Sequence, residues 1–98
     1  MIAEVVTLKK QSKKEKAEGV LNFLNEKTGR RFRPTPVNLK FITARMDEGY
    51  TVEDMRAVVA MKCREWPKGH EMNGFLRPAT LFNCEKFNSY AGFLGDDE

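Results

Sequence analysis

The sequence predicts a small all-α domain with three main helices and one or two short C-terminal helices. Apolar residues recur at spacings of three and four over three stretches, which is the period of one helix face. Capping residues and helix terminators stand at the ends of these stretches. No run alternates apolar and polar residues for long enough to indicate a strand. With 98 residues, the chain has the size of one domain.

The first helix is predicted from about residue 13 onward. Its apolar face consists of four residues at positions i, i+3, i+4 and i+7: Ala17, Val20, Leu21 and Leu24. Gly29 stands where a left-handed C-terminal cap belongs. The helix is therefore expected to stop at Lys27 or Thr28.

The second and third helices have clear start and stop signals. Thr35 is suited to cap the second helix, Pro36 suits its first position, and Gly49 is expected to end it. Thr51 is suited to cap the third helix, which has two acidic residues in its first turn. Pro67 is expected to end that helix, because a proline disfavours the α conformation in the residue before it.

The C-terminal part is predicted to form one or two short helices. Pro78 can open a helical turn, and four later residues keep helical spacing: Phe87, Tyr90, Ala91 and Leu94. The predicted organisation has three parts. Residues 1–12 form a flexible basic arm, residues 13–94 form the helical domain, and residues 95–98 form an acidic tail that is expected to fray.

Charge is distributed unevenly along the chain. Residues 1–46 contain 11 Lys/Arg and 4 Glu, and residues 47–98 contain 6 Lys/Arg and 10 Asp/Glu, so the halves carry net charges of +7 and −4. Such an asymmetry favours an anionic partner for the first half and a different partner for the second. A solvated surface without a partner is the alternative.

Basic residues concentrate in the arm and in the segment TGRRFRPTP (residues 28–36). One arginine after the first helix would satisfy the negative end of the helix dipole, but three in four positions exceed that need. Guanidinium groups match phosphate geometry, and lysines add affinity that does not depend on sequence. The candidate nucleic-acid-binding residues are Lys9, Lys10, Lys13, Lys14, Arg30, Arg31, Arg33 and Lys40. The alternative is a solvated loop with internal ion pairs.

The second half of the chain holds several aromatic residues that could face a protein partner. The candidate partner-binding residues are Trp66, Phe82, Phe87 and Tyr90. A tryptophan at the end of an amphipathic helix is typical of a core position, and most of the other rings are expected to cover the core. Rings left exposed beside charged residues would form an apolar patch with a charged rim, as protein-binding sites do.

Several function classes find no support in the sequence. The only histidine, His70, has no nucleophile at a predictable spacing, and no glycine-rich loop ends in Lys-Ser/Thr, so no enzyme activity and no cofactor are expected. Cys63 and Cys84 are too few and too far apart for a structural zinc site, so no metal is expected. The chain shows neither a signal peptide nor a membrane span, and a cytoplasmic location is expected.

Several motifs together resemble one known family. They are LNEKTGRRF, ITARMDEGYT, the lysine and tryptophan of MKCREW, and FLRPATLF followed by KFNSY. Over about residues 20–94 the chain is similar to the C-terminal domain of phage replication-initiation proteins, the replisome organisers, which are related to DnaD-type primosomal proteins. In that family the domain follows a winged-helix, origin-binding domain. No such domain precedes it here, so the chain is either part of a larger protein or a stand-alone phage protein, and recognition of a specific origin is not expected.

The resemblance implies a role in helicase recruitment and DNA contact. We therefore expect a phage DNA replication module that binds DNA, single-stranded or without specificity, and docks onto the replicative helicase or its loader. The alternative is a protein-interaction module that captures or inhibits a host replication factor and never touches DNA.

Overall fold

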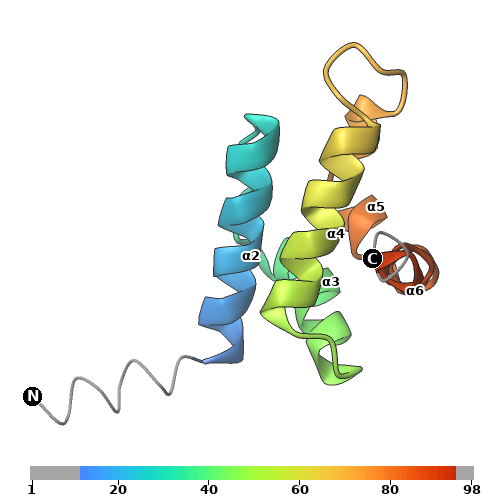
Figure 1. Ribbon diagram of the computed structural model, residues 1–98. Helices are drawn as coiled ribbons and strands as arrows, with labels where there is room; N and C mark the ends of the chain where they lie inside the picture. The colour runs from blue at the N-terminus through green and yellow to red at the C-terminus, as the bar shows by residue number, and fades with distance from the viewer. Residues whose placement is uncertain (1–11, 95–98) are drawn as a thin grey trace, which may run out of the picture.

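The computed structural model describes residues 12–94, which form an all-helical domain (Figure 1). Its elements are α2 (Lys13–Thr28), α3 (Pro36–Asp47), α4 (Val52–Glu65), the 3-10 helix η1 (Asn73–Phe75), α5 (Pro78–Leu81) and α6 (Cys84–Gly92). No strand occurs among these described residues, so the all-α class is confirmed. Residues 1–11 of the predicted arm and the predicted tail, residues 95–98, lie outside the described range.

The predicted helix boundaries are confirmed by their capping geometry. Gly29 follows α2 in the left-handed conformation, with φ of 74°. The hydroxyl of Thr35 accepts a hydrogen bond from Asn38 N–H at the start of α3. Thr51 caps α4 in the same way and forms a reciprocal capping box with Asp54. The capping residues read from the sequence therefore stand where these helices begin and end.

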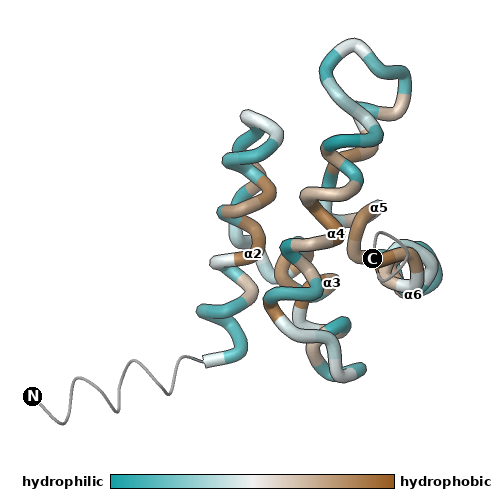
Figure 2. Tube along the Cα trace, viewed as in Figure 1, coloured by the Kyte–Doolittle hydropathy of each residue, from teal (hydrophilic) through white to brown (hydrophobic). Residues whose placement is uncertain are grey.

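Three long helices surround the core. Helices α2 and α4 lie side by side, α3 crosses near their lower ends in Figure 1, and α5 and α6 pack against α3 and α4. Apolar residues gather where these helices face one another (Figure 2). The core consists of Ala17, Val20, Leu21, Leu24, Leu39, Ile42, Met55, Val58, Val59, Leu76, Leu81, Phe82 and Phe87.

Two of the predicted partner-binding rings belong to this core. Phe82 and Phe87 are both 0% exposed. Phe87 stacks on Phe82, with ring centroids 5.8 Å apart, and its ring meets Tyr50 edge to face at 4.7 Å. The prediction that these two rings lie on a docking surface is therefore wrong. Helices α2, α3 and α4 do not close the core by themselves, and the rings of the C-terminal segment fill the space beside α3 and α4.

Arg45 is the buried cation that joins α3 to the C-terminal segment. Its Nη1 donates a hydrogen bond to the carbonyl oxygen of Phe82 at 3.1 Å, and its Nη2 lies 3.0 Å from Glu48 Oε2. Arg45 is therefore held inside the fold by Glu48 and by the C-terminal segment, and it does not extend the basic surface. The other nearby acid, Asp47, pairs with Lys13 at the start of α2.

Candidate nucleic-acid interface

The segment between α2 and α3, residues 29–35, is the arginine loop. Its side chains alternate in exposure: Arg30 and Phe32 are half-buried, whereas Arg31 and Arg33 are exposed. The three arginines that the sequence groups together are therefore divided between the interior and the surface.

Arg30 connects the arginine loop to the segment between α4 and α5. Its Nη2 donates to Asn73 Oδ1 at 2.8 Å, and its Nη1 donates to the carbonyl oxygen of Leu76 at 3.3 Å. Asn73 Nδ2 in turn donates to the carbonyl oxygen of Trp66 at 2.8 Å. Arg30 thus has a structural role that its position in the sequence does not reveal.

The backbone of the arginine loop is held by two asparagine side chains. Asn25 on α2 donates from Nδ2 to the carbonyl oxygen of Phe32 and accepts from the N–H of the same residue, both at 2.9 Å. Asn38 on α3 donates to the carbonyl oxygen of Arg33 at 2.8 Å. The loop therefore presents Arg31 and Arg33 from a backbone whose position is fixed.

The other predicted basic residues have different surroundings. Lys9 and Lys10 lie outside the described residues, and Lys13 is paired with Asp47. Lys14 and Lys40 are exposed. Within residues 12–94, the side chains of Arg31, Arg33, Lys14 and Lys40 have no carboxylate partner.

Trp66 and Tyr90 form one half-buried cluster with Lys62. Their rings meet edge to face, with centroids 6.3 Å apart, and Lys62 Nζ lies 4.4 Å from the Trp66 ring and 4.2 Å from the Tyr90 ring. Lys62 Nζ also pairs with Glu65 at 2.8 Å. Burial, and then the charge of Glu65, raise the pKa of the Tyr90 phenol. The cluster joins α6 to the end of α4, and its rings are packed against the core while remaining partly exposed.

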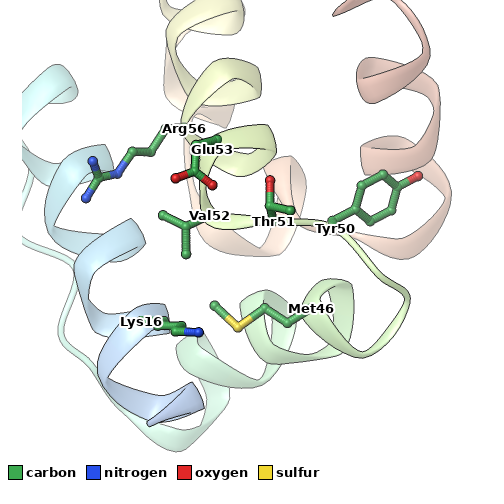
Figure 3. Close-up of a pocket in the computed structure, with 7 residues that line it drawn as sticks. All are labelled: Lys16, Met46, Tyr50, Thr51, Val52, Glu53 and Arg56. Carbon is green, nitrogen blue, oxygen red and sulfur yellow. The ribbon is translucent and has the colours of Figure 1, made fainter. Parts of the chain in front are cut away.

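A second group of cations, outside the set of candidate nucleic-acid-binding residues, lies between α2 and α4. Lys16 and Arg56 line an open hollow of about 580 Å³ together with Met46, Val52 and Glu53 (Figure 3). Figure 3 shows the Arg56 guanidinium extending from α4 toward α2. Residues from three separate helices form this hollow, so no continuous sequence motif marks it.

Cys63 is a chemical probe of the contact between α2 and α4. Burial raises the pKa of its thiol, and the nearby charges of Lys27 and Arg30 only partly oppose this shift. Cys84 is exposed, whereas Cys63 is half-buried.

We therefore expect Cys84 to react with a thiol reagent such as DTNB well before Cys63 at mildly alkaline pH. Thiolate is the reactive form, and both burial and a raised pKa reduce its availability. Labelling of the single variants Cys63→Ser and Cys84→Ser would assign the two phases, and both thiols should react quickly in denaturant. If Cys63 reacted first, α2 and α4 would not be packed together as described.

Residues 12–94 contain no group of three or more metal-ligating side chains. In the same range, every helix is too short or too polar to cross a membrane.

Comparison with known proteins gives one match. A family model described as "Conserved phage C-terminus" matches residues 20–92. No curated protein and no solved structure matches the chain.

Proposed function

The chain belongs to the conserved phage C-terminus family, and from this membership we propose that it serves phage DNA replication. It binds DNA without sequence preference and docks onto the replicative helicase or its loader. The family assignment gives a phage setting, and the resemblance of its motifs to the C-terminal domains of replication-initiation proteins supports replication as the process.

The observation that carries the proposal is the presentation of Arg31 and Arg33. Both side chains are exposed, and neither has a carboxylate partner within residues 12–94. Asn25 and Asn38 hold the backbone that carries them. A phosphate ligand therefore need not break an internal ion pair, and little loop entropy is lost on binding.

Replacing Arg31 and Arg33 together by alanine should weaken DNA binding and flatten its salt dependence. Each phosphate contact on a single strand contributes about −0.7 to the slope of log K against log salt, so the double variant should lose about 1.4 from this slope. Arg30 is left unchanged, because its hydrogen bonds hold the loop in place.

The matched control is the double variant Lys68→Ala/Lys86→Ala, which removes the same charge from exposed positions in the second half of the chain. It should keep the wild-type slope. Equal slopes for all three proteins would contradict a role of the arginine loop, and the absence of any DNA binding at about 50 mM salt would contradict the proposed function itself.

The helicase or its loader docks on aromatic side chains in the second half of the chain, other than the buried Phe82 and Phe87. Phe93 follows Tyr90 at i+3 and is 59% exposed, and Trp66 lies against Tyr90. Residues at i and i+3 are neighbours on a helix surface. The proposed docking surface therefore consists of Trp66, Tyr90 and Phe93.

The same docking surface, in which Phe93 is exposed and Trp66 and Tyr90 are half-buried, favours a second candidate function. This is a module that captures a host replication factor without touching DNA. A pull-down from host lysate with and without nuclease separates the two functions. Capture of a replication protein by a chain that shows no DNA binding of its own would favour the second.

A further inference from the structure

The cations between α2 and α4 continue beyond the hollow as a row, which we call the α2–α4 seam. The seam consists of Lys16, Phe23 and Lys27 on α2 and Arg56 on α4. Lys27 Nζ lies 5.4 Å from the centroid of the Phe23 ring, and the Arg56 guanidinium carbon lies 5.5 Å from it. Arg56 also lines the hollow with Lys16. An aromatic ring on α2 is therefore flanked by one cation of its own helix and by one cation of α4.

The charge of the seam is largely uncompensated. Lys16, Lys27 and Arg56 are exposed and have no carboxylate partner within residues 12–94. Glu53 is the only acidic residue among those that line the hollow. The seam thus attracts an elongated anion more strongly than a compact neutral ligand.

We propose that a single strand of DNA binds along the α2–α4 seam, with phosphates on Lys16, Lys27 and Arg56 and one base stacked on Phe23. This inference rests on the proposed function and names the form of DNA that is bound. Proteins that hold single strands combine a cationic groove with aromatic rings on which bases stack. A DNA duplex cannot stack a base on Phe23, because its bases are already paired and stacked inside the double helix.

The dimensions of the seam suit a few nucleotides. Lys16 and Lys27 are eleven residues apart on one helix, which corresponds to about 16 Å along its axis. Phe23 lies between them. Single-strand-binding modules contact about 4–16 nucleotides, so the seam would hold a part of such a site.

Lys27 and Arg56 both lie over the Phe23 ring. A base that stacks on this ring would therefore take the place of a cation. A stacked base interacts more strongly with an aromatic face than an exposed lysine or arginine does. A base can therefore displace Lys27 or Arg56 from Phe23, and the displaced cation can pair with a neighbouring phosphate.

Phe23→Leu tests the stacking contact, because leucine keeps the apolar packing and removes the aromatic face. Binding of an oligo(dT) of about 12 nucleotides should weaken about 5- to 150-fold, the effect of losing one stacked base, whereas Phe23→Tyr should bind like the wild type. An abasic strand of the same length should bind the wild type and Phe23→Leu equally. Equal binding of oligo(dT) by Phe23→Leu and the wild type would overturn the proposal.

The double variant Lys27→Gln/Arg56→Gln tests the phosphate contacts independently of core packing, since both residues are exposed. It should reduce the salt slope for oligo(dT) by about 1.4, and Lys68→Ala/Lys86→Ala should not. Preference of the wild type for duplex over single-stranded DNA would also overturn the proposal.

These results are distinguishable from failure of the proposed function. If the seam variants bind DNA normally and Arg31→Ala/Arg33→Ala does not, the seam inference is wrong and the DNA-binding function stands. If the wild type binds neither single-stranded nor duplex DNA, both are wrong. Binding of an acidic peptide but no DNA would assign the seam to a protein partner instead.

Discussion

Replacing Phe87 by alanine is expected to lower the free energy of unfolding by about 3–5 kcal/mol, the usual cost of removing a buried phenylalanine ring. Phe87 is 0% exposed and contacts Phe82 and Tyr50 through its ring. Its loss would leave a cavity where α6 packs against α3, α4 and α5. For a domain of this size such a loss is a large share of the total stability.

Phe93→Ala on the same C-terminal segment is the matched control. Phe93 is 59% exposed, so its replacement should change the free energy of unfolding by no more than about 0.5 kcal/mol. Urea denaturation followed by circular dichroism measures both variants. Equal stabilities for Phe87→Ala and the wild type would mean that α6 does not pack as described, and Phe87 would again be a candidate for partner binding.

The Asn25→Ala variant should lose about 2–3 kcal/mol of stability, because it removes two hydrogen bonds and leaves half-buried N–H and carbonyl groups of Phe32 without partners. The same change releases the arginine loop. If the fixed backbone contributes to phosphate contact, Asn25→Ala should also bind DNA more weakly than the wild type, although no positive charge has been removed. Denaturation and a DNA titration in the folded range of conditions measure the two effects separately.

Asn22→Ala provides the comparison for this variant. Asn22 is exposed on the same helix, nearly one turn earlier, and its replacement should leave both stability and DNA binding within about 0.5 kcal/mol of the wild type. A stable Asn25→Ala variant with unchanged DNA affinity would show that the loop needs no anchoring from α2. A stable variant with weakened affinity would attribute the loss to loop order alone.

Stability should also respond to alkaline pH through Tyr90. Its folded-state pKa lies above the ordinary value, so the neutral phenol is favoured in the folded protein. The stabilisation is present below the unfolded-state pKa and is lost as pH rises through the folded-state pKa. The half-buried thiol of Cys63 contributes in the same direction, because its pKa is also raised.

The ends of the helices and the all-α class could be predicted from the sequence. Gly29, Thr35 and Thr51 act within one helical turn of their own positions, so their effects do not depend on which elements pack together. The apolar face of α2 could also be predicted from the sequence, because the spacing of its four buried residues matches the period of a helix.

The different roles of Arg30, Arg31 and Arg33 could not be predicted in the same way. The sequence shows three similar side chains in four positions, and only the folded structure separates the half-buried Arg30 from the exposed Arg31 and Arg33. The hydrogen-bond partners of Arg30, at Asn73 and Leu76, lie more than forty positions away in the chain.

The sequence by itself therefore determined the helices, their caps and the charge asymmetry of this protein, because these follow from interactions between near neighbours and from composition. Only the tertiary structure decided that Phe82 and Phe87 are core rings and that Phe93 is exposed, since the sequence shows only an aromatic-rich segment and not which rings the core covers. It also brought Lys16, Phe23 and Lys27 beside Arg56. The physical reason is the same in both cases: exposure and proximity depend on which helix faces pack together, and a residue's own local sequence does not specify its neighbours across the core.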